Sequence, residues 1–189
     1  MKLLTCFAFV AIMFATTISA DEYKVDASHS MMAFKVKHLG VSYTHGRFND
    51  FKGNFTFDAN DTSKNSISIK IAAKSIDSNS AKRDDHLRGK DFFFVKKYKT
   101  LSFESTSFKK KEGSKNEFIV EGTMKMHGKK KTITVDAKLV GEGKDPWGGY
   151  RCGFSCSFTI KRSDFGMKYM IGGISDEVHI TADVEGIRK

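Results

Sequence analysis

A strict alternation of side-chain character runs through residues 151–161. Apolar side chains occupy every second position, at Cys152, Phe154, Cys156, Phe158 and Ile160. Successive side chains of a β-strand point to opposite faces of the sheet, so a period of two predicts a strand with one buried face. The preceding residues 145–150 contain the single proline of the chain and predict a turn. A strand this long, with one polar face, is typical of a barrel wall.

The same period of two recurs in seven further segments. They lie at residues 32–38, 51–57, 67–73, 101–105, 118–126, 133–141 and 178–184. Eight mostly sequential strands joined by short polar turns predict an all-β fold, namely an extended eight-stranded antiparallel barrel of up-and-down topology. Closing the sheet on itself also removes unpaired strand edges.

Residues 78–90 lack this alternation and predict a short helical insertion between strands 3 and 4 of the predicted barrel. Ser78 or Asn79 is a suitable N-cap and Gly89 a suitable C-cap. Phe92 and Phe93 follow at once. We therefore expect the helix and this aromatic cluster to lie across one mouth of the barrel.

Residues 1–20 predict a cleavable signal peptide. They contain one charged residue, an apolar run too short to span a bilayer comfortably, and a small-residue segment that ends just before Asp21 and Glu22. We expect cleavage after Ala20, export of the mature chain, and one barrel domain over residues 21–189. A retained N-terminal anchor is the alternative.

The chain is basic, with a formal net charge of +10 at pH 7. Lysines cluster near predicted turns at residues 96–97, 109–111 and 129–131. They are either ordinary solvated turn residues or a weak attraction to an anionic membrane surface. Nucleic-acid binding is not expected, because the chain is exported and its positive charge does not come from interleaved arginines and aromatics.

Glycines on the predicted inward faces, together with many phenylalanines and several methionines, favour an open interior. Gly53, Gly122 and Gly141 occupy positions where a packed core would carry Val or Leu, although they could equally mark bulges or corners. An eight-stranded barrel is either filled by its own side chains or holds one small ligand. We expect an elongated apolar pocket for a long-chain lipid, lined by Phe34, Val36, His38, Phe51, Gly53, Phe55, Ile69, Phe92, Phe93, Phe103, Val120, Gly122, Met124, Val135, Leu139, Phe154 and Phe158.

Signatures of metal binding and catalysis are missing from the sequence. The six histidines show no metal-ligand spacing, and there is no nucleophile elbow, phosphate loop or dinucleotide fingerprint. We expect neither an enzyme nor a cofactor apart from a bound lipid. Cys152 and Cys156 would lie about 13 Å apart on one strand, too far for a disulfide, so we interpret them as small core residues rather than a redox pair.

Five short motifs, in their order and spacing, resemble those of the YceI-like family. They are Asp-Ala-Ser-His-Ser at residues 26–30, Val-Lys-His-Leu-Gly-Val-Ser at 36–42, Arg-Asp-Asp-His-Leu-Arg at 83–88, Asp-Pro-Trp-Gly at 145–148 and Arg-Ser-Asp-Phe-Gly at 162–166. The family consists of lipocalin-like periplasmic proteins associated with polyisoprenoid and other lipid binding. The resemblance covers essentially the whole mature chain.

This resemblance implies a periplasmic barrel that binds, transports or sequesters an isoprenoid quinone-like, polyisoprenoid or fatty-acyl ligand without changing it. It also implies a mouth and head-group region formed by His29, Arg83, His86, Trp147, Arg151 and Asp164. Asp164 could equally form a structural ion pair with Arg162 that closes the last hairpin.

Two other functions remain open at this point. One is a filled barrel that acts as a stress-related interaction module without a ligand. The other is an enzyme acting on isoprenoid-like substrates, with His38 or His86 as general base. The sequence also leaves the oligomeric state open, with a homodimer as one option.

Overall fold

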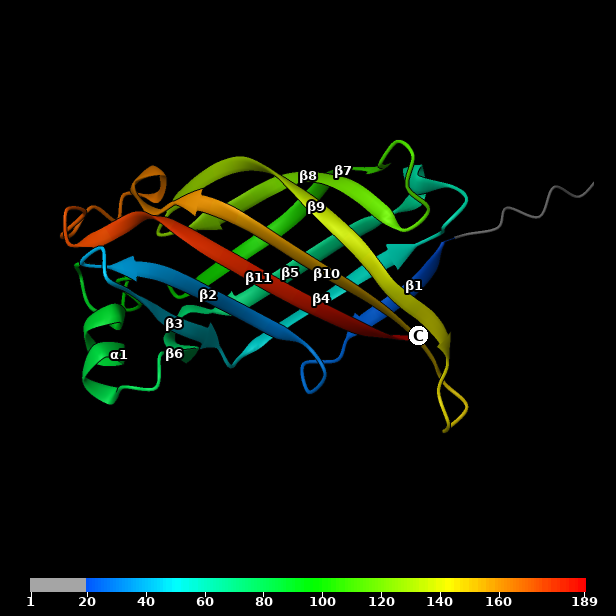
Figure 1. Cartoon of the computed structure of the whole chain (residues 1–189). Coiled ribbons are helices and arrows are strands. Elements are labelled where there is room, and N and C mark those ends of the chain that lie inside the picture. Colours follow the sequence, from blue (N-terminus) through cyan, green and yellow to red (C-terminus); the bar gives the residue numbers. More distant parts are fainter. Residues whose placement is uncertain (1–19) are drawn as a thin grey trace, which may run out of the picture.

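The computed structural model describes residues 20–189, which form one antiparallel barrel with a single α-helix and three short 3₁₀ helices (Figure 1). The expected signal peptide lies outside the described residues except for Ala20. Within residues 20–189, no helix combines the length and the apolar character needed to cross a membrane.

The strands of the described chain follow one another with short connections. They are β1 (Asp21–Val25), β2 (Met31–His38), β3 (Ser42–Phe48), β4 (Phe51–Phe57), β5 (Ser66–Ala72), β6 (Ile76–Asp77), β7 (Thr100–Lys110), β8 (Glu117–Met126), β9 (Lys129–Lys144), β10 (Tyr150–Lys161) and β11 (Ile174–Arg188). The helices are η1 (Thr62–Lys64), η2 (Ala73–Ser75), α1 (Ala81–Arg88) and η3 (Arg162–Phe165).

The sheet closes because β1 is hydrogen-bonded to both β4 and β11. Three of the barrel's eight strands are interrupted, so that each consists of two shorter strands. β1 and β2 both pair with β11, and they pair in turn with β4 and β3. Likewise β5 pairs with β4 and β6 with β3. Joining β1 with β2, β3 with β4 and β5 with β6 gives a closed eight-stranded antiparallel barrel, which confirms the all-β prediction.

Helix α1 lies at one end of the barrel beside β3 and β6 (Figure 1). It begins slightly later than expected, with Ser80 in the N-cap position and Gly89 as the C-cap. Neither of the two expected residues occupies the N-cap position. The Ser78 hydroxyl donates to Asp84 (2.5 Å), and Asn79 has a left-handed backbone with φ of 61°.

The opposite end of the barrel is closed by packed aromatic rings. Tyr23 stacks on Phe55 with ring centroids 4.8 Å apart, and Phe57 meets Phe118 and Phe154 edge-on at 5.6 and 5.0 Å. These five side chains are at most 8% exposed. The interior is therefore packed solid at this end, which also carries the turn between β9 and β10 (Figure 1).

A β-bulge corrects the expectation for Gly141. Gly153 pairs with Gly141 and Phe154 with Leu139, so Val140 is the extra residue of β9 and is 71% exposed. The extra residue reverses which face the following positions occupy. Gly141 is consequently exposed and does not face the interior.

Candidate functional site

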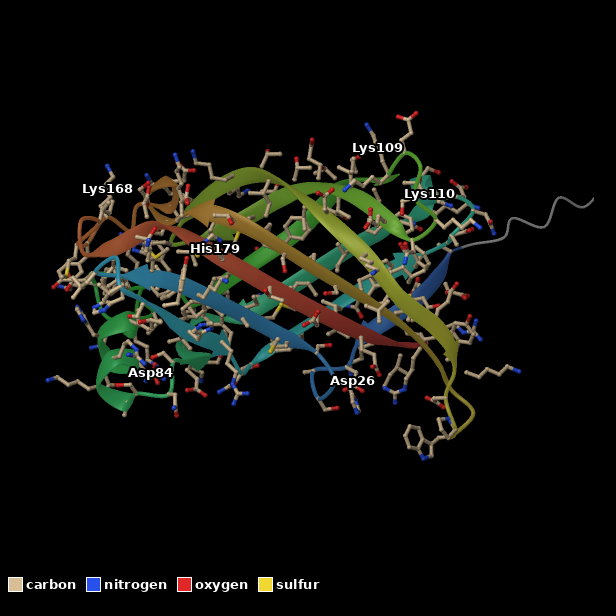
Figure 2. All side chains as sticks on the ribbon, in the orientation of Figure 1. Asp26, Asp84, Lys109, Lys110, Lys168 and His179 are labelled. Carbon is tan, nitrogen blue, oxygen red and sulfur yellow. The ribbon has the colours of Figure 1, made fainter. Side chains whose placement is uncertain are left out.

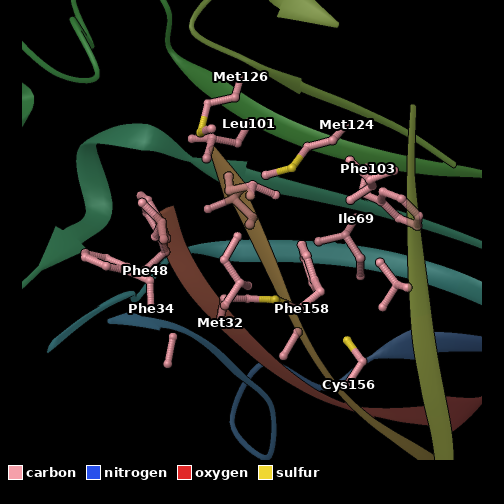
Figure 3. A pocket seen from close by; sticks show the side chains of 18 of the residues that line it. Met32, Phe34, Phe48, Ile69, Leu101, Phe103, Met124, Met126, Cys156 and Phe158 are labelled. Atoms are coloured by element: carbon pink, nitrogen blue, oxygen red, sulfur yellow. The ribbon is translucent and has the colours of Figure 1, made fainter. Parts of the chain in front are cut away.

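A cavity of about 590 Å³ occupies the barrel between α1 and the aromatic end. This volume lies within the range of about 300–1,000 Å³ typical of small-ligand pockets. Figure 3 shows side chains from different strands, among them Met32, Ile69, Phe103 and Phe158, pointing into the same space. The barrel is thus not filled by its own side chains.

Most of the expected lining residues do line this cavity. Strand alternation turns those of the barrel wall inward, whereas Phe92 and Phe93 lie in the turn after α1. The expected residues that line the cavity are Phe34, Val36, His38, Phe55, Ile69, Phe92, Phe93, Phe103, Val120, Met124, Val135, Phe154 and Phe158.

Phe51 and Leu139 do not line the cavity. Phe51 directly follows the break between β3 and β4 and is buried in the hydrophobic core at 7% exposure. Leu139 precedes the bulge at Val140, where it pairs with Phe154 and packs half-buried against the core.

Gly53 and Gly122 do not create the cavity either. A Cβ atom on Gly53 would collide with the Ser68 carbonyl oxygen and the Ile69 side chain. One on Gly122 would collide with the ring of Phe103 and the Glu104 carbonyl oxygen. The space that these glycines leave is thus taken by the neighbouring strand and is not available to a ligand.

Further lining residues were missed by the sequence analysis. One group shares the alternation of strands already recognised and could have been found from it: Met32, Ile67, Ile71, Leu101, Met126, Ile133, Ile160, Val178, Ile180, Ala182 and Val184. The second group lies where no alternation is visible, in β3, α1 and the segment after β10: Phe48, Leu87, Arg162 and Met167.

The charged and imidazole side chains of the lining, His38, Arg83, His86 and Arg162, gather near α1. The other polar lining residues are Ser42, Thr44, Thr56, Ser66 and Ser102. Within residues 20–189, no aspartate or glutamate lines the cavity. Ser42, Arg83 and His86 are also solvent-exposed, so the cavity has an opening beside α1.

Arg162 is a buried cation at this end of the cavity, with only 4% exposure. It donates to the carbonyl oxygens of Met167 (3.0 Å), Ile174 (2.8 Å) and Ser175 (2.9 Å). Burial lowers the pKa of its guanidinium. The expected ion pair with Asp164 is not formed, because three backbone carbonyls already take up the guanidinium.

Arg83 and His86 project from α1 at the opening. Arg83 donates to the hydroxyl (2.8 Å) and carbonyl oxygens of Ser78. The His86 ring lies 5.1 Å from Phe92 and 5.3 Å from Tyr169, and its Nε2 lies 2.9 Å from Asp91. The opening therefore combines positive charge with aromatic surface.

Comparison with known proteins identifies the fold and family. Residues 23–186 match the YceI-like domain. The chain belongs to the YceI-like family. A UPF0312 protein of Pseudomonas aeruginosa is 44% identical over 181 residues, covering 95% of this chain and 93% of the relative. The crystal structure of the Campylobacter jejuni YceI protein is similar at a TM-score of 0.73 and 27% identity, covering 97% of this chain and 99% of that one.

A more distant structural neighbour is a Saccharophagus degradans domain described as polyisoprenoid-binding. Its TM-score is 0.67 at 14% identity, and the match covers 88% of this chain and 98% of that domain. At this identity the similarity concerns the fold alone. The expected YceI-like resemblance is confirmed by the family match and by the Pseudomonas relative.

In this YceI-like protein, the expected head-group residues do not come together. Arg83 and His86 lie at the opening, whereas His29, Trp147 and Arg151 lie toward the other end of the barrel, and none of these three lines the cavity. Turns of an up-and-down barrel alternate between its two ends. The turn before β10 therefore lies at the end opposite α1, and counting strands would have indicated this from the sequence.

Asp164 lies near the opening but outside the cavity. Its side chain is 52% exposed, and Oδ1 lies 3.9 Å from Lys131 Nζ. At this distance and exposure, the pair is a weak surface contact.

Arg151 organises a structural network on the side of the barrel. It donates to Asp26 (3.0 Å), Asp145 (3.1 Å) and Glu185, and so ties two turns to β11. Asp26, His29 and Glu185 could place three ligand atoms within 4.8 Å of one another around a cation. The Arg151 guanidinium already supplies the positive charge between the two carboxylates.

The two cysteines of the YceI-like domain are free thiols. Burial raises the pKa of Cys152 to about 12 and that of Cys156 to about 11. Because thiolates are the reactive form, both are poor nucleophiles near neutral pH. Cys156 lines the cavity as a small apolar group.

Proposed function

We propose that this YceI-like protein binds a long apolar lipid inside its barrel and carries or sequesters it without chemical change. The observation that supports this proposal is the 590 Å³ cavity, whose walls are mainly apolar and whose basic lining side chains lie near α1. Isoprenoid quinone-like, polyisoprenoid and fatty-acyl chains have this character. The structural neighbour described as polyisoprenoid-binding supports the same class of ligand.

Chain length can supply most of the affinity. Burying a CH₂ group contributes about 0.8 kcal/mol, from which the cost of ordering the chain is subtracted. The cavity walls are built largely from Phe, Ile, Val and Met side chains. Methionine adapts its shape to irregular ligands. Such a lining favours a class of long chains over a single rigid molecule.

The ligand is proposed to enter with its tail toward the aromatic end. Arg83, His86, His38 and Arg162 all lie near α1, and no acidic side chain within the described residues opposes them in the cavity lining. A polar head group that accepts hydrogen bonds or carries negative charge would therefore remain at the opening. The signal peptide expected at residues 1–20 supports a periplasmic location.

A variant whose cavity is obstructed by a larger side chain would test this function. Ala182 lines the cavity on β11, paired with Cys156 and Met32, whereas the neighbouring Thr181 points outward and lies 3.3 Å from the Ser157 hydroxyl. Binding of the fluorescent fatty acid cis-parinaric acid would be titrated for the unaltered protein, Ala182→Phe and the matched control Thr181→Phe. We expect at least a tenfold loss of affinity for Ala182→Phe alone.

Lipid extraction and native mass spectrometry of protein purified from its own host would identify the natural ligand. Thermal unfolding would show that Ala182→Phe is folded. The proposal is wrong if no lipid co-purifies and the unaltered protein binds neither cis-parinaric acid nor a long-chain quinone. Equal binding by folded Ala182→Phe would also contradict the assigned cavity.

A further inference from the structure

Five large apolar side chains are exposed at the end of the barrel that carries α1. Leu39 and Val41, in and next to the β2–β3 turn, are 57% and 84% exposed. Tyr169, Met170 and Ile171, in the loop before β11, are 42%, 50% and 39% exposed. We call this group the apolar tip. Clustered exposed apolar side chains of this kind mark interaction surfaces.

The two loops of the apolar tip form one surface. The Leu39 amide donates to the Gly173 carbonyl oxygen (2.7 Å), and Gly173 closes a turn with Met170 (3.0 Å). A Cβ on Gly173 would lie 3.4 Å from Leu39 Cδ2 and 2.6 Å from Met170 Cε. The loops also lie side by side in Figure 1. The apolar side chains are therefore held next to one another by the backbone.

Backbone conformation makes this surface unusual. Leu39 and Met170 have φ values of 49° and 51°, in the left-handed region. Bulky apolar residues rarely adopt it, whereas Asn and Gly adopt it readily. Each tip loop thus carries a large apolar side chain at a position where a small or polar residue would be less strained. Local stability does not explain this choice.

Lysines lie at the same end of the barrel as the apolar tip. Lys168 precedes it directly, and Figure 2 places this residue at the same end as Asp84 of α1. Lys129 Nζ would lie 3.7 Å from a Cβ on Gly166, and Lys90 lies 6.0 Å from the ring centroid of Phe94. None of Lys90, Lys129 and Lys168 forms an ion pair within residues 20–189.

Both ends of the barrel carry ion pairs, and at the α1 end Arg88 pairs with Asp85 (3.1 Å) and Lys131 with Asp164 (3.9 Å). At the end opposite α1, Arg188 pairs with Asp21 (2.9 Å) and Lys189 with Glu22 (3.2 Å). Trp147 is 80% exposed there, with the Arg151 guanidinium 5.7 Å from its ring centroid. The α1 end is thus distinguished by several large exposed apolar side chains that lie together.

The apolar tip adjoins the opening of the cavity. The Tyr169 ring lies 5.3 Å from His86 and 5.4 Å from Phe92, and both of these residues line the cavity. Leu39 follows His38, another lining residue. An apolar surface therefore continues from the tip into the barrel.

We propose that the apolar tip docks this protein onto an anionic lipid bilayer. The five apolar side chains enter the interfacial layer, and the lysines at this end lie among the phosphate groups. Apolar insertion combined with electrostatic attraction is how peripheral proteins bind anionic membranes. Docking in this orientation directs the opening of the cavity toward the lipids, so a ligand can pass between bilayer and barrel without crossing water.

Vesicle binding tests the docking. Sedimentation with vesicles of phosphatidylcholine alone and of phosphatidylcholine with phosphatidylglycerol would compare the unaltered protein with Leu39→Asn/Met170→Asn. Asparagine tolerates a left-handed backbone, so this variant should keep its fold. We expect binding to the anionic vesicles only, weaker binding at high salt, and at least a tenfold loss in the double variant.

The matched control is Trp147→Asn, which removes a large exposed apolar side chain from the opposite end and should bind vesicles normally. The proposal is overturned if the unaltered protein ignores anionic vesicles, or if Trp147→Asn weakens binding as much as the tip variant. It is also overturned if the tip variant instead converts a dimer into a monomer in size-exclusion chromatography. Binding of cis-parinaric acid in the absence of vesicles should be the same for the tip variant, which separates docking from lipid binding.

Discussion

Single glycines in the barrel wall make room for neighbouring side chains. The Phe103 ring occupies the space of a Cβ atom on Gly122, and the Phe34 ring occupies the space of a Cβ atom on Gly46. Alternation along β8 predicted that Gly122 faces inward. It could not predict what occupies the adjacent space, because that depends on pairing between strands. The prediction that glycine enlarges the cavity failed for this reason.

Replacing Gly122 by alanine should destabilise the protein by about 1–3 kcal/mol, the usual cost of overpacking a core. The new Cβ would meet the Glu104 carbonyl oxygen at 2.6 Å as well as the Phe103 ring. Urea unfolding followed by far-UV circular dichroism would measure the free energy of unfolding.

Gly141→Ala is the matched control for Gly122→Ala, because both changes add one methyl group to a strand glycine. A Cβ on Gly141 has no neighbour within 4 Å. Its free energy of unfolding should stay within about 0.5 kcal/mol of the unaltered protein. Equal effects of the two changes would disprove the packing argument.

Helix α1 is held at the opening by arginine side chains more than by apolar packing. Arg88 donates to the carbonyl oxygens of Lys74 (2.9 Å) and Ile76 (2.8 Å), and so fastens the end of the helix to β6. Asp84 is the only residue of α1 that is fully buried. A short helix held by a few polar contacts can open locally without unfolding of the barrel.

Arg88→Ala should loosen α1 selectively. Loss of two hydrogen bonds from a charged donor should raise amide hydrogen exchange in residues 81–88 about tenfold, equivalent to about 1.4 kcal/mol. Exchange in β8 and β10 should not change. Lys82→Ala, on the exposed surface of the same helix, should leave exchange near its original rate. Uniformly faster exchange throughout the barrel would contradict local anchoring.

The strands with a clear alternation of apolar side chains could be predicted from the sequence. The interrupted strands could be predicted only in part. β3 was missed because its inward positions include Thr44 and Gly46, which remove the apolar period. β6 has two residues, too few for any period to be visible. The bulge at Val140 was invisible because an inserted residue is detected only against the partner strand.

For the molecule as a whole, the end at which each turn lies follows from strand order. The turns at residues 38–42, 126–129 and 162–173 lie at the α1 end, and those at 58–65, 111–116 and 145–149 lie at the other. Chain order alone could therefore have separated Trp147 and Arg151 from His86. The buried position of Arg162 could not have been foreseen, because its partners are backbone carbonyls of a loop.

Acid should weaken the closed barrel through Asp26. Hydrogen bonds from Ser28, then from His29 and Arg151, hold the pKa of Asp26 well below its usual range. The resulting stability is present above the unfolded-state pKa of about 4 and is lost as the pH falls toward the folded-state value. Asp26→Asn should therefore lower the urea midpoint clearly at pH 7, and the difference should shrink as the pH is lowered from 4 to 2.

Asp85→Asn serves as the control, because the Asp85 side chain is 80% exposed and pairs only with Arg88 among the described residues. Its urea midpoint should follow that of the unaltered protein at pH 7 and at pH 2. Urea unfolding should be followed by circular dichroism at 218 nm or by hydrogen exchange. The fluorescence of Trp147 is a poor probe because this side chain is already exposed in the folded protein. An Asp26→Asn difference of the same size at pH 2 and pH 7 would exclude this role.

The hydrogen bonds between β1 and β11 bring the first and last described strands into contact. The Lys189 amide donates to the Glu22 carbonyl oxygen (2.9 Å), so a short peptide could join the two strands without disturbing either. A circularly permuted protein with its new termini in the exposed turn between β7 and β8 would have the same order of paired strands around the barrel. The architecture thus depends on which strands are adjacent and not on which of them is synthesised first.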